Sequence, residues 1–420
     1  MKVLFLADNF APEKNAQASR VYERACYWVR WGHEVTAITC APNFPEGKVY
    51  DGFQNRWYGV SELSGIRVVR VKTFIASNSG TVRRILDYLS FMVTAFVAGL
   101  FQPKPDLIAV TSPQFFAAVG ACALAWIRRV PFVLELGDLW PDSIVAVGAM
   151  KKGFGLHMLE KVELFMYRRA ERIIPLTNSF KRNLIGRGVP ECKIDVVING
   201  VDLSRYAPRP RNLDLAEEWG IAPGEFVVAY VGTHGMAHAL GNVLDAAEHT
   251  NGRIRWLLVG AGAERENLVA DANRRRLSNL TMIGAQPKER MPDVWSLSDV
   301  ALVHLRDTPL FESVIPSKIF EAMGMGLPIL LACPTGEASQ IVQESGAGIC
   351  IRPEDPEALA AAAELLSGNP ELTRKFASRS LASAPHYSRE RQARDYMAAL
   401  EKALVDSSHA SRFSEPSVGR

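Results

Sequence analysis

Strand-like and helix-like segments alternate along this chain in two successive series, and this repeat constrains the fold more than any other feature. The first series opens with a β-type run at Val3–Ala7, helical spacing over Ser19–Trp31 and a second β-type run at Glu34–Thr39. Strands joined through helices pair in parallel, with helices on both faces of the sheet. Five more strands are predicted in this series: Val68–Val71, Leu107–Thr111, Phe132–Leu136, Arg172–Leu176 and Ile194–Ile198.

The second series follows Ser204–Pro223, a Pro- and Arg-rich segment that we interpret as a linker with a short helix. Its predicted strands are Phe226–Val231, Trp256–Val259, Leu280–Ile283, Val300–His304, Pro328–Leu331 and Gly348–Ile351. Its helices are expected to begin near Gly241, Glu264, Lys288, Pro316, Glu337 and Asp355. The prediction is an α/β protein with two doubly wound parallel sheets in tandem.

This organisation sets the expected domain boundaries. Residues 1–205 form the first unit and residues 206–387 the second. Helical spacing over Ser388–Ala403 predicts a closing helix that returns to the first unit, because its apolar side needs a surface to cover. The polar segment 406–420 is expected to be a disordered tail.

Composition and cysteine usage narrow the class of protein. With 420 residues, 48% hydrophobic and 22% charged, the chain is a globular protein of two or more domains. Its six cysteines contain no CxxC pair, which favours a reduced cytosolic compartment. The longest apolar stretch, Tyr88–Phe101, is shorter than the roughly 18–20 residues that span a bilayer, so no membrane-spanning segment is expected.

Charge is distributed unevenly between the two halves. Residues 1–205 contain 26 Lys and Arg against 18 Asp and Glu, whereas residues 206–420 contain 22 against 27. The basic first half is therefore the half expected to meet an anionic surface.

Known nucleotide-binding motifs are missing from the strand ends. The segment after the first strand has no glycine, GxxxxGK[ST] is absent, and no DxD pair occurs to hold a nucleotide-sugar through a metal ion. Ligand phosphates would then need backbone N–H groups, helix N-termini and a few basic side chains.

The segment Pro316-Ser317-Lys318 fits that need best. It marks a helix start, where the dipole favours an anion, and Lys318 adds a full charge. Glu321, one turn later, has the acceptors to bind a ribose diol. The alternative is an ordinary surface pair between Lys318 and Glu321.

Several short motifs, in order, resemble family 4 glycosyltransferases of the GT-B type, which have two Rossmann-like domains facing a cleft. They are Gly32-His33-Glu34-Val35, Gly188-Val189-Pro190, Asn199-Gly200-Val201-Asp202, Val231-Gly232, Glu321-Ala322-Met323, Gly326-Leu327-Pro328 and Gly336-Glu337. Asp138-Leu139-Trp140-Pro141 and the loop Gly232–His238 are most similar to the L-fucosamine transferase-like branch, which serves bacterial surface polysaccharides.

The resemblance implies a set of nucleotide-sugar contacts in the second unit. These are Gly232, Thr233, His234, His238, Gly260, Gly262, Ile283, Pro316, Ser317, Lys318 and Glu321. Members of the family have two glutamates eight residues apart, and Glu321 corresponds to the second. Ser313 stands eight residues before Glu321 in this sequence, and Glu312 is one residue out of register, so either Glu312 or Ser313 faces the donor sugar. Ala16–Ala18 replaces the family's glycine pair, and histidines replace its Arg and Lys, which shifts charge neutralisation onto Lys318.

Asp138 and the first helix supply candidates on the acceptor side. Asp138 follows a predicted strand and is a candidate to orient the acceptor hydroxyl or take its proton, with a buried turn cap as the alternative. Asn15, Gln17 and Arg20 are candidates for diphosphate or acceptor contacts, although Arg20 also fits an exposed helical arginine.

The segment Arg67–Lys104 suggests how a lipid-linked acceptor would be reached. It carries six basic residues against one acidic residue. A helix lying in the membrane interface would place Arg83 and Arg84 on lipid head groups and Tyr88 and Phe91 at the acyl boundary. The alternative is a half-buried core helix.

These observations predict a metal-independent glycosyltransferase, cytoplasmic and peripheral at the inner face of the cytoplasmic membrane, and the resemblance implies that it retains the anomeric configuration. It would move a hexose, N-acetylated and deoxygenated, from a UDP-sugar to a polyprenyl-diphosphate-linked saccharide, with Asp138, Glu312, Ser313 and Lys318 as catalytic candidates and no cofactor. No nucleic-acid partner is expected. The alternatives are a nucleotide-sugar 2-epimerase of the same fold and a non-catalytic subunit that binds lipid-linked saccharide.

Overall fold

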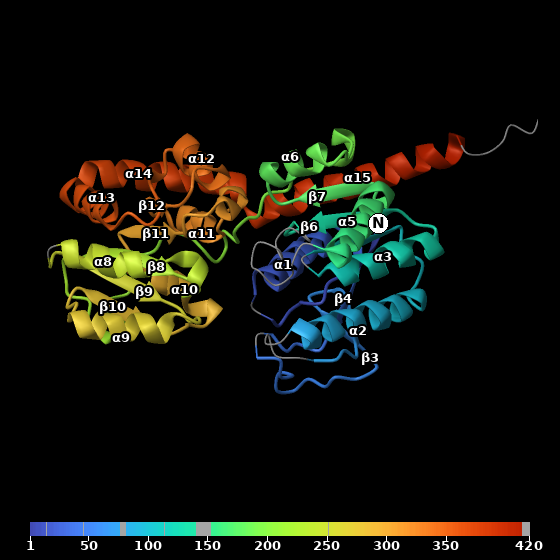
Figure 1. Ribbon diagram of the computed structural model, residues 1–420, viewed down its shortest axis with the longest axis horizontal. Helices are drawn as coiled ribbons and strands as arrows, with labels where there is room; N and C mark the ends of the chain where they lie inside the picture. The colour runs from blue at the N-terminus through green and yellow to red at the C-terminus, as the bar shows by residue number, and fades with distance from the viewer. Residues whose placement is uncertain are drawn as a thin grey trace, which may run out of the picture. The chain divides into compact units, whose positions relative to one another are not determined.

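The computed structural model describes residues 1–13, 15–44, 46–75, 81–112, 114–139, 153–250 and 252–413, with only the backbone at 81, 82 and 409–413. The chain divides into two compact units, unit 1 (Met1–Ile198 with Gln392–Arg420) and unit 2 (Asn199–Arg391). The division lies close to the boundary predicted at residue 205. Each unit has its own sheet, so the predicted α/β class with two parallel-sheet domains is confirmed (Figure 1).

Unit 1 is built on a seven-stranded sheet within the described ranges, in the order β3-β4-β2-β1-β5-β6-β7. Its strands are β1 (Lys2–Leu6), β2 (Glu34–Cys40), β3 (Tyr58–Leu63), β4 (Ile66–Val71), β5 (Leu107–Thr111), β6 (Phe132–Leu136) and β7 (Arg172–Pro175). The central strands β5 and β6 are buried along their whole length because helices cover both faces.

Helices pack on both faces of this sheet. They are α1 (Ala16–Arg30), α2 (Thr81–Leu100), α3 (Phe115–Arg128), α5 (Phe154–Arg169), α6 (Asn178–Gly186) and α15 (Arg389–Phe413), with a 3₁₀ turn at Glu191–Lys193. One core cluster joins α2, α3 and α5 to the sheet through residues such as Phe91, Ala121 and Met166. The other joins α1 and α15 through Trp28 and Tyr396. The closing helix therefore lies against unit 1.

Three details differ from the sequence prediction for unit 1. Ile194–Ile198 is not a strand; Ile194 makes only an isolated bridge to Ile173. β3 was not predicted, and it pairs antiparallel with β4 at the edge of the sheet. The closing helix continues through Asp406 to Phe413, which contradicts disorder over 406–413; residues 414–420 lie outside the described residues.

Unit 2 has a parallel sheet that comprises, in the described part of the chain, six strands in the order β10-β9-β8-β11-β12-β13. The strands are β8 (Phe226–Val231), β9 (Ile254–Val259), β10 (Leu280–Ile283), β11 (Val300–His304), β12 (Ile329–Ala332) and β13 (Gly348–Ile351). The helices are α7 (Leu213–Glu218), α8 (Gly241–His249), α9 (Arg265–Arg275), α10 (Met291–Ser296), α11 (Lys318–Met325), α12 (Glu337–Ser345), α13 (Pro356–Gly368) and α14 (Pro370–Ser383). Four 3₁₀ turns within the described ranges complete it: Met236–His238, Lys288–Arg290, Pro309–Ser313 and Ala384–Tyr387.

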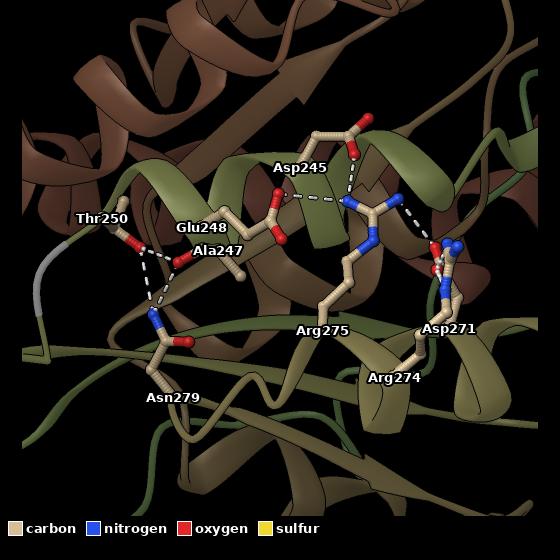
Figure 2. A network of polar contacts seen from close by, with 8 residues as sticks. All are labelled: Asp245, Ala247, Glu248, Thr250, Asp271, Arg274, Arg275 and Asn279. Atoms are coloured by element: carbon tan, nitrogen blue, oxygen red, sulfur yellow. Dashed lines mark hydrogen bonds and ion pairs between the residues drawn. The ribbon is translucent and has the colours of Figure 1, made fainter.

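An ion-pair network joins α8 and α9 near their C-terminal ends (Figure 2). Arg275 lies 2.5 Å from Asp245 of α8 and 2.7 Å from Asp271 of its own helix. These carboxylates raise the pKa of the Arg275 guanidinium. Asn279 adds a hydrogen bond of 2.9 Å to the Ala247 carbonyl oxygen. The network holds together the two helices that follow the loops of the candidate site.

Candidate functional site

Two loops at the carboxyl ends of β8 and β9 lie in close contact in unit 2. The Gly232 N–H donates to the Val259 carbonyl (2.9 Å), and the His234 N–H donates to the Ala261 carbonyl (2.9 Å). A Cβ added to Gly260 would lie 1.8 Å from the Gly232 carbonyl oxygen, and one added to Gly262 would lie 2.3 Å from that of His234. Only glycine fits at both positions, so the missing side chains of Gly260 and Gly262 allow the two loops to pack together, and their predicted contacts with a donor stay predictions.

Lys318, the first residue of α11, is buried beneath the β8 loop. Its side chain is 9% exposed, and Nζ lies 3.6 Å from the centroid of the Tyr230 ring. Within the described residues Nζ has no hydrogen-bond partner. Burial lowers the pKa of the Lys318 ammonium to about 7. The interpretation of Lys318 as half of a surface pair is therefore wrong.

Glu321 lies one turn further along the same helix. It is half-buried, and its Oε2 accepts a hydrogen bond of 3.1 Å from the Trp295 indole N–H. The predicted helix start is two residues early, because α11 begins at Lys318 with Ser317 as N-cap and Pro316 before it. Ser317 makes no side-chain cap bond, so its hydroxyl is not used at that end of the helix.

Three histidines lie near Lys318. His234 is 0% exposed with both ring nitrogens unpartnered in the described structure, and His238 Nδ1 lies 3.3 Å from the His304 carbonyl oxygen. Burial lowers the pKa of each of these three imidazoles to about 4. All three are neutral at pH 7, so positive charge among these four side chains comes from Lys318 alone. His304 was not predicted, although its place at the end of β11 is the signal that finds it.

In unit 1, a cavity of about 440 Å³ lies at the carboxyl ends of the strands. It brings together residues that the sequence assigned to separate tasks: Asn15, Gln17, Arg20, Arg84, Tyr88 and Phe91. Asn15 caps α1 through the Ala18 N–H (2.8 Å). Gln17 donates to Asp8 at 3.0 Å.

Arg20 is buried, so its interpretation as an exposed helical arginine is wrong, whereas its contact with a diphosphate or acceptor stays a prediction. Its side chain is buried, with Nε 2.7 Å from Glu135 of β6. Arg24, one turn later, reaches the other oxygen of Glu135 at 2.6 Å. Arg20 still lines the cavity, but its charge is offset by Glu135.

Comparisons with known proteins identify the family of this chain. The family model described as Glycosyltransferase Family 4 matches residues 17–205, and that described as Glycosyl transferases group 1 matches residues 213–381. The chain is a family 4 glycosyltransferase. It is 25% identical to the putative colanic acid biosynthesis glycosyl transferase WcaI of Escherichia coli K12, over 91% of this chain and 96% of that one.

Solved structures show the same GT-B fold. Sucrose-phosphate synthase from Thermosynechococcus elongatus aligns with a TM-score of 0.73 over 97% of this glycosyltransferase and 100% of that chain, at 18% identity. Anabaena HepE in complex with UDP-glucose aligns with a TM-score of 0.68 over 96% of this chain and 99% of that one, at 18% identity.

The other catalytic candidates of the glycosyltransferase lie on strand ends and turns. Asp138 is half-buried just after β6, and its carbonyl lies 3.5 Å from the Ser112 hydroxyl; Trp140 and Pro141 lie outside the described residues. Glu312 is exposed, and the Ser313 hydroxyl donates to the Leu310 carbonyl (3.1 Å). The contact of Glu312 or Ser313 with the donor sugar stays a prediction.

Two predicted donor contacts occupy strand ends of unit 2. The Thr233 carbonyl accepts from the Tyr230 hydroxyl (2.8 Å). Ile283 ends β10, and its carbonyl accepts from the Gly260 N–H (3.0 Å). Their contacts with a donor remain predictions.

The apolar helix α2 presents a different face from the one predicted. Phe91 is 1% exposed and belongs to the core, so its assignment to the acyl boundary is wrong. The exposed apolar residues are Ile85, Leu86, Val93, Val97 and, just past the helix, Phe101, which is 79% exposed. Within the described ranges no helix combines the length and apolar character needed to cross a bilayer.

Proposed function

We propose that this glycosyltransferase moves a hexose, N-acetylated and deoxygenated, from a UDP-sugar to a polyprenyl-diphosphate-linked saccharide in surface-polysaccharide synthesis. The observation that carries the proposal is Lys318, a buried lysine whose Nζ has no hydrogen-bond partner among the described residues, next to the tightly packed Gly232 and Gly260 loops. Burying an ammonium group costs free energy unless an anion pairs with it. The UDP-glucose complex of HepE and the colanic acid assignment of WcaI support this choice of donor and pathway.

In this proposal, catalysis rests on stabilising the departing diphosphate. Lys318 would turn from the Tyr230 ring to a phosphate oxygen, while the neutral imidazoles of His234 and His238 donate N–H groups. Glu321 would accept the ribose hydroxyls, and Asp138 would orient the acceptor hydroxyl. The reaction would retain the anomeric configuration, and the L-fucosamine transferase-like branch supplies the first donor to test.

A transfer assay tests this function. A panel of UDP-sugars is incubated with and without polyprenyl-diphosphate-linked saccharide. We expect transfer only when both are present, and we expect it to persist in EDTA because Lys318 supplies the cationic contact to the phosphates. Conversion of a UDP-sugar without acceptor would indicate an epimerase, and no conversion with any pair would indicate a binding subunit. Loss of transfer that only Mg²⁺ or Mn²⁺ restores would contradict the phosphate assignment.

We also propose that α2 attaches the glycosyltransferase to the cytoplasmic membrane surface. Arg83 and Arg84 are exposed at the start of α2, and Val93, Val97 and Phe101 are exposed further along. Replacing both arginines with Glu should release the protein from anionic vesicles, because each basic residue near such a surface contributes about 1 kcal/mol. Arg275, whose charge is held by ion pairs in unit 2, gives a control as Arg275→Gln. If the wild type and the double variant floated equally with the vesicles, α2 would be a core helix without a role at the membrane.

A further inference from the structure

The cavity of unit 1 contains polar groups that the proposed donor site does not use. Asp8, Thr73 and Asp87 line it, and none was predicted from the sequence as a site residue. They come from three different segments: the loop after β1, the loop after β4, and α2. Its volume, about 440 Å³, is within the range of small-molecule sites.

We infer that this cavity recognises the terminal sugar of the acceptor as an uncharged polyol, through Asp8, Asp87 and Thr73. The inference rests on the proposed function, because it specifies which acceptor that function uses. These three residues would determine specificity by binding hydroxyl groups and by excluding acidic sugars.

Asp8 is held rigidly at the wall of the cavity. Its Oδ1 accepts a hydrogen bond from Gln17 (3.0 Å), and its carbonyl accepts from the Thr39 hydroxyl (2.9 Å) and the Cys40 thiol (3.1 Å). Burial raises the pKa of the Asp8 carboxyl, although Asn9 and Gln17 oppose the shift. Asn9 and Gln17 both hydrogen-bond to this carboxylate, which fixes its orientation at the cavity wall.

Thr73 is an independent sign that the cavity takes a polar ligand. Its side chain is 5% exposed, and Oγ1 has no hydrogen-bond partner in the described structure. Asn55 fixes the backbone of Thr73 on both sides, accepting from its N–H (3.1 Å) and donating to its carbonyl (2.8 Å). Buried hydroxyls are normally paired, and a ligand hydroxyl would pair this one.

Asp87 faces the same cavity from α2. Burial and the nearby Asp8 raise the pKa of the Asp87 carboxyl to about 7, while Arg84 opposes the shift. Near neutral pH Asp87 therefore exists as both carboxyl and carboxylate. The two forms can donate to and accept from a sugar hydroxyl, respectively.

The charges around the cavity favour a neutral sugar over an acidic one. Asp8 and Asp87 both carry negative charge when ionised, and Glu13, buried behind the loop at Asn43, adds to it. The charge of Arg20 is already offset by Glu135. A uronate or phosphate inside the cavity would meet like charges, which disfavours its binding.

Arg84 differs from Arg20 because its side chain is exposed. It lies 3.2 Å from the Tyr88 hydroxyl on the side of the cavity formed by α2. The acceptor diphosphate would therefore lie toward Arg84, with the terminal sugar deeper in the cavity.

Binding of matched glycosides tests the inference directly. Calorimetry compares short-chain alkyl glycosides of glucose, galactose, mannose and fucose with the alkyl uronides of the first three, in the absence of donor. We expect at least one neutral glycoside to bind about tenfold more tightly than any uronide. Thr73→Val and Asp87→Asn, both close in shape to the originals, should each weaken that binding about tenfold. Thr94→Val, whose hydroxyl bonds only within α2 (to the Ser90 carbonyl, 2.9 Å, and the Phe91 carbonyl, 3.4 Å), should leave it unchanged.

The outcomes separate this inference from the proposed function. Neutral glycosides that bind in a manner sensitive to Thr73 and Asp87 support the inference even if no transfer is observed. Uronides that bind as well as neutral sugars, or binding unchanged in both variants, overturn it even if transfer from a UDP-sugar is demonstrated. Absence of all glycoside binding overturns it as well. Melting temperatures close to wild type verify that each variant is folded.

Discussion

Lys318→Met should lower the turnover number at least about tenfold and also raise the melting temperature of the protein without ligand. A charge-assisted contact to the leaving diphosphate contributes about 1.5–3 kcal/mol, and about 1.4 kcal/mol corresponds to one decade in rate. The rise in stability has a separate cause. Burial lowers the pKa of Lys318 from 10.5 to about 7, so the charged form is disfavoured in the folded protein. Methionine has a similar length and carries no charge to bury.

The pH dependence of stability isolates this effect. Between pH 7 and about 10.5 the unfolded chain binds a proton at Lys318 that the folded chain does not, so wild-type stability rises with pH across that window. The difference in melting temperature between Lys318→Met and wild type should therefore be largest below pH 7 and shrink as pH rises. Lys375→Met, at an exposed lysine of α14, should change neither the turnover number nor the melting temperature. Full turnover together with a lower melting temperature would show that Lys318 has no role at the phosphates.

The same pKa affects donor binding. Above pH 7 the lysine must take up a proton before it can pair with a phosphate, which costs about 1.4 kcal/mol per pH unit. UDP affinity of the wild type should therefore fall as pH rises above 7, whereas that of Lys318→Met should stay nearly flat. If UDP affinity changed with pH equally in wild type and Lys318→Met, the pH dependence would come from another titratable group.

Sequence periodicity was sufficient where strands are buried on both faces. Leu107–Thr111, Phe226–Val231 and Val300–His304 were predicted with the bounds that the structure has. β3 was missed because it is an edge strand, mostly exposed, without a continuous apolar run. Ile194–Ile198 has the apolar pattern of a strand, but it makes only two backbone hydrogen bonds to β7, from the Asp195 N–H to the Ile173 carbonyl and from the Val197 N–H to the Pro175 carbonyl (both 3.1 Å), and an isolated bridge. A hydrophobic pattern predicts that a segment is buried, but it does not show which strand the segment pairs with.

The candidate site was predictable by position and not by environment. The family resemblance identified Gly232 and His234, and the predicted helix start identified Lys318, but whether a helical lysine is exposed depends on what packs over it. Here the β8 loop and Tyr230 cover Lys318. The partner of Arg20 lies 115 residues along the chain, on β6, where neither local spacing nor charge pattern indicates it. Tertiary packing decides the protonation and pairing of these groups.

The Glu135 network supplies the second large effect. Glu135 is fully buried on β6 and pairs with Arg20 at 2.7 Å and Arg24 at 2.6 Å. Arg24 also lies 3.7 Å from the centroid of the Tyr396 ring, so the network connects β6, α1 and α15. Burial alone would raise the pKa of Glu135, but Arg24 and Arg20 hold it below its usual range. This stabilisation is present above pH 4.5 and is lost as pH falls through the lowered pKa.

Glu135→Gln should therefore destabilise unit 1 strongly, because it leaves two buried guanidinium groups without a counter-charge. Removing one partner of a buried ion pair costs about 3–5 kcal/mol, which corresponds to roughly 6–20 °C in melting temperature for a unit of this size. Arg20→Met is the matched comparison, since it leaves Glu135 paired with Arg24 and should cost clearly less. Unfolding in urea, followed by circular dichroism, measures both. If Glu135→Gln were no less stable than Arg20→Met, the two arginines would not depend on Glu135, and α1 and α15 would be held to the sheet by apolar packing around Trp28 and Tyr396 alone.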